Sequence, residues 1–305
     1  MAVLREGDVV KVLGYGCRVV LGFAVMLAGC HGAGAPAKSA TQEYPVRGIV
    51  VSVDATAGTV VLNHETIPGF MEAMEMSYRL EDKSVASELH PGDKVTATLK
   101  AERDAAGPVN MRLANFVVIA QARPDYKPKV EYHVPAPGDT VPKFTLLNQS
   151  GKTIGLEQFR GKVVVMTFVY TRCPLADFCP KMSRNFAEID KALEGDPKLY
   201  EKTHLLSVSF DPTYDTPKVL KSYGAAYTGR FTKETFAHWD FAAPPVAELP
   251  KMEQFFDLGV TPGDDGSLMH SLSTAVIGKD GKVVAFYPNN DWDVATVLAQ
   301  VRSAA

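Results

Sequence analysis

The stretch KVVVMTFVYTRCPLADFCPKMS, residues 162–183, decides the fold of the C-terminal half of this chain. Its first part, residues 163–170, is a continuous apolar run rich in β-branched residues, which is typical of a strand buried on both faces. Pro180 stands where a helix can begin, because proline is tolerated in the first helical turn. Apolar residues then recur at helical spacing over residues 178–189. We therefore predict a central strand, a short loop and a helix.

Two cysteines, Cys173 and Cys179, lie in the predicted loop between this strand and this helix. A helix N-terminus stabilises a thiolate, which is the form of cysteine that binds soft metals and attacks disulfides. The other two of the chain's 4 cysteines, Cys17 and Cys30, belong to the N-terminal segment. The folded body therefore keeps a single pair, which is too few for a disulfide scaffold and indicates a functional dithiol.

Length and composition set the class of protein. A chain of 305 residues predicts two domains, each with enough residues for a core. A hydrophobic fraction of 46% and a charged fraction of 22% are those of an ordinary soluble globular protein. The formal net charge of -3 gives no indication of nucleic-acid binding.

The N-terminal segment, residues 1–30, reads as a targeting signal. Its apolar run at 19–28 is too short to span a bilayer comfortably. The run ends in Leu27-Ala28-Gly29-Cys30, which resembles a bacterial lipobox, whose cysteine is lipidated and becomes the first mature residue. The alternative is a plain secretory signal with an incidental cysteine. Either reading predicts export to the periplasm or cell envelope, and the first predicts a membrane-anchored lipoprotein. The basic residues of the segment are Arg5, Lys11 and Arg18.

A β domain is predicted between two connecting segments. Residues 31–43 are small and polar and read as a flexible tether, and the proline-punctuated residues 123–137 read as a semi-rigid linker. Between them, residues 44–122 hold five short strand-like runs, which predict a small all-β barrel of the OB type. The runs are residues 46–53, 59–63, 74–80, 94–99 and 115–120.

The informative part of this domain is NHETIPGFMEAMEMSY, residues 63–78. His64 ends the second predicted strand, and Met74 and Met76 point to one face of the third because side chains alternate along a strand. Thioether sulfur with an imidazole is a soft ligand set that suits Cu(I) or Ag(I). The alternative is that the methionines only fill a barrel core.

This segment resembles the CusF family of periplasmic Cu(I)/Ag(I)-binding proteins. The family site has one histidine, two methionines and a capping tryptophan, and His64, Met74 and Met76 match the three ligands. Met71 falls near the position of the tryptophan, and residues 44–122 contain no tryptophan. The resemblance therefore implies a copper site that lacks its cap or uses Met71 as a further thioether ligand.

Residues 138–305 alternate strand and helix and end in a hairpin around 278–281, as in an α/β thioredoxin-like fold. They resemble the SCO/SenC family through FVYTRCP, SVSFDPTYDTPKVLKSY and LMHSLSTAVIGKDG. Family members hold copper with two cysteines and a histidine, which match Cys173, Cys179 and His270. The family usually has three residues between the cysteines, whereas five stand here. An aspartate near Asp211 is linked in the family to copper handling and partner contact.

Three interpretations of the dithiol stay open. With His270 it is a ligand set that suits Cu(I) and can support Cu(II). Alone it is a redox pair that exchanges disulfides with a client protein, and a permanent structural disulfide is the third reading. The soft-metal domain upstream favours copper.

We consider structural roles for the remaining polar residues. We expect Asp211 and Asp215 either to support the metal site from outside its ligand set or to cap a turn or helix, and capping is the more common role. We expect His204 and His238 to be buried and hydrogen-bonded. We expect His90 to lie at a turn and His133 to be exposed to solvent.

The sequence thus predicts an exported copper chaperone rather than an enzyme. It would bind Cu(I) at both sites and deliver it to a cuproprotein, which the SCO/SenC resemblance implies is the copper centre of a respiratory oxidase. A membrane-anchored thiol–disulfide oxidoreductase that reduces client cysteines before metallation is the alternative. A copper-sequestering resistance protein without a client is the third possibility.

Overall fold

The computed structural model describes residues 40–104, 107–123, 126, 132–262, 268–290 and 292–305. The predicted signal segment and its Cys30 lie outside these residues. No helix in the described part of the chain is both long and apolar enough to cross a membrane.

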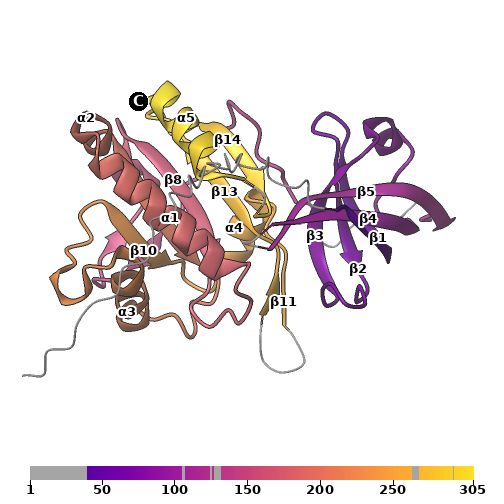
Figure 1. Ribbon diagram of the computed structural model, residues 1–305, viewed down its shortest axis with the longest axis horizontal. Coiled ribbons are helices and arrows are strands. Elements are labelled where there is room, and N and C mark those ends of the chain that lie inside the picture. The colour runs from indigo at the N-terminus through magenta and orange to yellow at the C-terminus, as the bar shows by residue number, and fades with distance from the viewer. Residues whose placement is uncertain (1–39, 105–106, 124–125, 127–131, 263–267, 291) are drawn as a thin grey trace, which may run out of the picture. The chain divides into compact units, whose positions relative to one another are not determined.

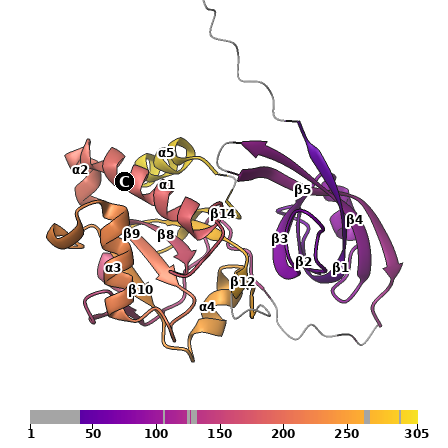
Figure 2. The ribbon, with the colours of Figure 1, turned by 60° about the horizontal axis from the view of Figure 1, so that its bottom comes forward.

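The β domain contains the five predicted strands. They pair in the order β1-β2-β3-β5-β4, and β1 also pairs with β4, so the sheet closes on itself (Figure 2). The β4–β5 hairpin is longer than predicted, because its outer end carries charged side chains that hide a strand pattern. The strands are β1 Gln42–Asp54, β2 Thr59–His64, β3 Met74–Leu80, β4 Lys94–Asp104 and β5 Gly107–Ala120, with a 3-10 turn at η1 Lys83–Ser87.

Strand register places the candidate ligands of this domain side by side. His64 pairs with Met74 and Leu62 pairs with Met76 across β2 and β3, and these four side chains are buried. Gly48 of β1 packs tightly against this point, since a Cβ there would lie 2.7 Å from the carbonyl oxygen of Asn63. Close approach of β1 therefore requires glycine at this position.

The C-terminal domain is built on a seven-stranded sheet with the order β14-β13-β8-β9-β10-β6-β7. β8 pairs in parallel with β9, and β9 with β10, while the terminal hairpin of β13 and β14 runs antiparallel. The strands are β6 Leu146–Asn148, β7 Thr153–Ile154, β8 Val163–Val169, β9 Thr203–Ser209, β10 Trp239–Ala243, β13 Ser273–Ile277 and β14 Val283–Pro288. A separate two-stranded sheet pairs β11 Val260–Pro262 with β12 Leu268–His270.

Five helices accompany this sheet: α1 Cys179–Glu194, α2 Pro197–Glu201, α3 Pro217–Thr228, α4 Leu249–Phe255 and α5 Val294–Ala304, with 3-10 turns at η2 Leu156–Phe159 and η3 Phe231–Lys233. α4 is short, and Pro250 falls in its first turn, where proline is tolerated. Thr216 is the residue before α3, and its side chain makes no capping hydrogen bond.

The central strand β8 is buried on both faces, as its composition predicts. On one face, Thr167 bonds Thr274, which in turn contacts Met182 of α1. On the other face, Phe168 packs against Phe256 at the end of α4. Helices therefore cover both faces of the sheet (Figures 1 and 2), which is the thioredoxin-like layer arrangement.

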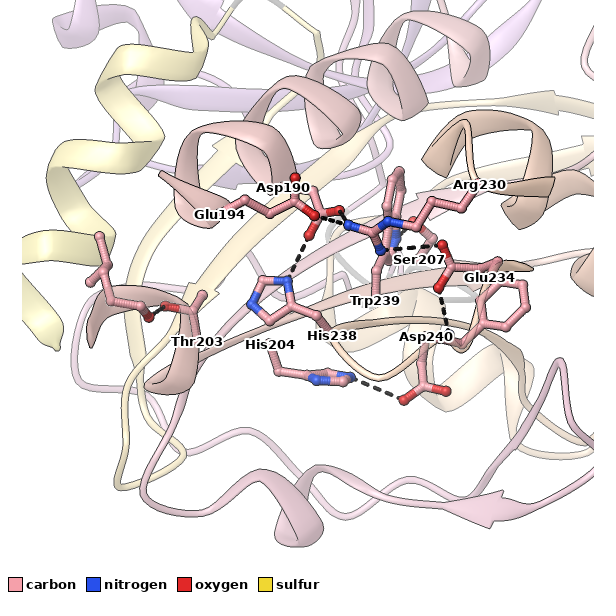
Figure 3. A network of polar contacts seen from close by, with 12 residues as sticks. Asp190, Glu194, Thr203, His204, Ser207, Arg230, Glu234, His238, Trp239 and Asp240 are labelled. Carbon is pink, nitrogen blue, oxygen red and sulfur yellow. Dashed lines mark hydrogen bonds and ion pairs between the residues drawn. The ribbon is translucent and has the colours of Figure 1, made fainter. Parts of the chain in front are cut away.

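A buried polar network secures α1 to the sheet (Figure 3). His238 Nδ1 lies 2.7 Å from the Asp190 carboxylate of α1, and His204 Nε2 lies 3.0 Å from the Asp240 carboxylate. Arg230 adds ion pairs to Asp190 and to two glutamates, Glu194 and Glu234. The prediction that His204 and His238 are buried and hydrogen-bonded is confirmed. The network fixes the helix whose first residue is Cys179.

Candidate metal centres

The dithiol lies where β8 ends and α1 begins. Cys179 opens α1 and is fully buried, whereas Cys173 lies in the preceding loop and is half-buried. His270, the last residue of β12, brings its Nε2 to 3.5 Å from Cys179 Sγ and 3.8 Å from Cys173 Sγ. The three ligand atoms all lie within 4.8 Å of one another, and no other such group of His, Cys, Asp and Glu occurs among the described residues. The structure therefore brings the three predicted ligands together.

The orientation of His270 is fixed by its own backbone. Its Nδ1 lies 2.7 Å from the Ser271 carbonyl oxygen, so this nitrogen carries the proton and donates it. The lone pair of Nε2 then faces the two sulfurs, which is how a ligating histidine is usually held. Three aromatic rings surround the imidazole: Tyr170, Phe178 and Phe210, at centroid distances of 5.4, 5.6 and 4.6 Å.

The two thiols differ in acidity. A hydrogen bond from the Cys179 thiol stabilises the Cys173 thiolate and lowers the pKa of Cys173. Burial raises the pKa of Cys179, and its bond to the Cys173 thiolate raises it further. The pair thus holds one proton, on Cys179. Two sulfurs and an imidazole form a soft donor set that fits copper.

Asp215 supports the start of this loop rather than capping a helix. Its buried carboxylate accepts hydrogen bonds from the Thr171 backbone at 3.0 Å, the Thr171 hydroxyl at 2.5 Å and the Ser209 hydroxyl at 2.6 Å. These bonds tie the end of β8 to the end of β9. The capping prediction for Asp215 is therefore wrong, because the hydroxyls of the neighbouring strand ends are nearer partners.

Asp211 also bonds to this loop. Its carboxylate accepts a hydrogen bond from Arg172 at 2.6 Å, and the Arg172 guanidinium lies over the ring of Tyr214 at 4.1 Å. The backbone carbonyl of Asp211, not its side chain, closes the turn with Tyr214 and Asp215. The side-chain capping prediction is thus wrong here too, because Arg172, the residue before Cys173, takes the carboxylate.

The second candidate centre lies inside the barrel. His64 is 1% exposed, and burial lowers its pKa while a bond to the Glu65 carbonyl opposes this effect. Its Nδ1 lies 2.8 Å from that carbonyl oxygen, whereas its buried Nε2 has no hydrogen-bond partner among the described residues. An unpartnered imidazole nitrogen beside the thioether of Met74 is costly in a core without a ligand and fits a soft metal.

Met71 joins this centre through a residue that the sequence reasoning missed. The hydroxyl of Tyr78 donates to Met71 Sδ at 3.6 Å, and the Tyr78 ring meets His64 edge-on at 5.8 Å. Tyr78 lies two residues beyond Met76 and on the same face of β3, so strand alternation could have identified it. Tyr78 therefore contacts both Met71 and His64.

Two further histidines lie outside both centres. The His90 side chain is exposed, and its backbone N–H bonds the Asp93 carboxylate at a turn, as predicted. His133 is about half exposed and bonds the Asp139 carboxylate at 2.9 Å, so it is both solvated and paired.

Comparison with known proteins divides the chain in the same way. Residues 134–305 match the SCO1/SenC family, and residues 43–111 match the copper binding periplasmic protein CusF. The SCO1 protein homolog of Bacillus subtilis is 29% identical over 171 residues, which are 54% of this chain and 82% of that protein. Protein SCO2 of Saccharomyces cerevisiae mitochondria is 34% identical over 163 residues, which are 52% of this chain and 50% of that protein.

A solved structure is also similar to the C-terminal part of the chain. The SCO1/SenC family lipoprotein from Bacillus anthracis is 26% identical, with a TM-score of 0.47, and covers 57% of this chain and 98% of that one. Copper is named as the bound metal in the description of the family that residues 43–111 match. The family match spans more than half of the chain, so this protein belongs to the SCO1/SenC family and carries a CusF-like segment before its SCO domain.

Proposed function

We propose that this protein is an exported copper chaperone that binds Cu(I) at the barrel and at the dithiol and delivers it to a cuproprotein. The observation that carries the proposal is the convergence of Cys173, Cys179 and His270 within 4.8 Å of one another. The unpartnered Nε2 of His64 supports a second site in the barrel, with Met74 and Met76 as ligands and Met71 as a further thioether. Copper is here the cargo of the protein.

The donor atoms favour one direction of transfer. His64 and its methionines are neutral, so a Cu(I) ion bound among them keeps its positive charge inside a buried site. Cys173 and Cys179 offer negative sulfurs, which offset that charge and bind soft metals more strongly. Transfer of copper from the barrel to the dithiol is therefore favourable in free energy. It proceeds by ligand exchange, through intermediates in which one copper ion is bound by ligands of both sites.

Other parts of the proposal rest on the sequence and the family. Lipidation at Cys30 would anchor the chain at the periplasmic membrane surface. A barrel of the OB type would then be held near the SCO domain by the connecting segment 123–137, which raises the effective concentration of one site at the other. Membership of the SCO1/SenC family supports the copper centre of a respiratory oxidase as the acceptor.

The test is an anaerobic Cu(I) titration of the reduced protein against a competing chelator. We compare wild type with Met74→Ala/Met76→Ala and with Cys173→Ser/Cys179→Ser. Two equivalents of copper, each lost with its own variant, are the expected result. A cysteine variant that binds as much copper as wild type would overturn the role of the dithiol as a copper site.

The asymmetry of the dithiol gives a specific reason to test the alternative. A half-buried Cys173 with a lowered pKa beside a buried Cys179 with a raised pKa is also the arrangement of an attacking and a resolving thiol. Metal-free protein that reduces insulin disulfides, and keeps doing so as His270→Ala, would favour a thiol–disulfide oxidoreductase. Loss of client metallation in His270→Ala would favour the chaperone.

A further inference from the structure

The five residues between the two cysteines, Pro174 to Phe178, form a folded segment. We call it the intercysteine segment. The Phe178 N–H donates to the Leu175 carbonyl at 3.0 Å, which closes a turn. Phe178 itself is buried, and its ring meets the His270 imidazole edge-on at 5.6 Å. The far end of the segment is thereby fixed against the ligand histidine.

Two side chains from outside the segment hold its middle. The amide of Asn290, which follows β14, donates to the Asp177 carbonyl at 2.6 Å and is 1% exposed. The guanidinium of Arg184, on the exposed side of α1, donates to the Ala176 carbonyl at 3.0 Å. Neither side chain has a described contact with a sulfur or with the ligand imidazole.

The two cysteines depend on this segment to different degrees. Cys179 is fixed by being the first residue of α1 and by the Tyr170 N–H, which lies 3.4 Å from its sulfur. Cys173 precedes the intercysteine segment and is half-buried. A free five-residue loop would let Cys173 sample many positions, and fixing each residue of such a loop costs about 1–2 kcal/mol of backbone entropy.

We infer that Asn290 and Arg184 are positioning residues that hold the intercysteine segment in the shape that keeps Cys173 within reach of Cys179 and His270. A shorter loop between the two cysteines would restrict the position of Cys173 by itself. In this longer loop, the two side-chain hydrogen bonds supply that restriction. The inference rests on the proposed function for its copper readout. Its thiol readouts are independent of copper.

The copper test compares Asn290→Asp, which keeps the shape of the side chain but removes the donor, with Arg184→Met and Arg184→Lys. Each donor-deleting variant releases one hydrogen bond that holds the segment, so we expect Cu(I) binding to weaken by about tenfold. Arg184→Lys keeps a donor and should recover most of the loss. Lys191→Met, on the exposed surface of the same helix, controls for the lost charge.

The first thiol test is exchange with glutathione, in which protein dithiol and one glutathione disulfide give protein disulfide and two glutathione thiols. The anchored segment holds the two sulfurs together, so its release should lower this equilibrium constant about tenfold, as expected when an effective concentration falls. The second is alkylation by iodoacetamide. At about pH 9, where an ordinary cysteine is also largely thiolate, Cys173 should react faster in the variants while Cys179 stays protected, whereas general unfolding would expose both.

The outcomes separate the two proposals. Variants that equal wild type in copper affinity, disulfide equilibrium and Cys173 alkylation would overturn the inference. A wild-type protein that binds no copper, with variants that still shift the disulfide equilibrium, would remove the copper function and leave the positioning roles in place. If Asn290→Asp lowers the melting temperature so far that it does not fold, the Arg184→Met and Arg184→Lys pair decides.

Discussion

The barrel and the SCO domain are unrelated folds, yet they hold a candidate ligand histidine in the same way. In each, Nδ1 bonds the carbonyl oxygen of the next residue, at 2.8 Å in His64 and 2.7 Å in His270. In the SCO domain Nε2 faces the two cysteine sulfurs, and in the barrel Nε2 is buried without a hydrogen-bond partner among the described residues. The difference lies in the sulfur, which is thioether in the barrel and thiol in the SCO domain. The histidine thus fixes the geometry of both sites. The type of sulfur sets the charge of each site and the pH dependence of copper binding.

The largest effect should follow removal of the thiols. Cys173→Ser/Cys179→Ser should weaken Cu(I) binding at the SCO domain by about 100-fold or more, since even outer partners of ligands contribute 10–100-fold. The barrel equivalent should remain, as measured by chelator competition. Equal loss at both sites would contradict the separation of the two centres.

A matched substitution in the barrel tests the second site of this comparison. His64→Leu removes the imidazole and fills its buried space with an apolar side chain. We expect Cu(I) binding at the barrel to fall by about 10–100-fold. The free energy of unfolding of the metal-free protein should hold or rise, because a buried unpartnered nitrogen is removed. Denaturant unfolding with and without copper measures both.

The Cu(I) affinities of the two sites should depend differently on pH, and the ratio of the two affinities should change about tenfold per pH unit. Cu(I) binding at the dithiol displaces the proton of Cys179, so its affinity should rise about tenfold per pH unit around neutrality. Thioethers carry no proton, and burial lowers the pKa of His64, so protons compete at the barrel only below the ordinary histidine range of about 6.5. Chelator titrations of each single-site variant between pH 6.5 and 8 check both slopes.

The smallest effect concerns Met71. Tyr78→Phe removes the hydroxyl that bonds Met71 Sδ and leaves the ring against His64. One weak hydrogen bond is worth about 0.5–1 kcal/mol, so copper affinity at the barrel should fall about threefold. X-ray absorption should report fewer sulfur ligands per copper in this variant. An unchanged sulfur count would assign Met71 to packing alone.

Much of both centres was predictable because periodicity and motif spacing report local structure. The apolar run before Cys173 predicts β8, and the alternation of Met74 and Met76 predicts a shared face. The supports of the SCO centre were not predictable, because Asp215 and Asn290 reach the cysteine loop from distant parts of the chain. Short elements such as α2 and the β11–β12 pair carry too few residues for a periodic signal.

The burial of the barrel sulfurs also bears on their chemical durability. Met74 and Met76 are 3% and 2% exposed, whereas Met71 is half-buried. Oxidation turns a methionine into a polar sulfoxide that needs a dedicated reductase, while an oxidised dithiol is restored by simple exchange with another thiol. Among the three thioethers, peroxide should therefore oxidise Met71 first, before the buried Met74 and Met76 are damaged.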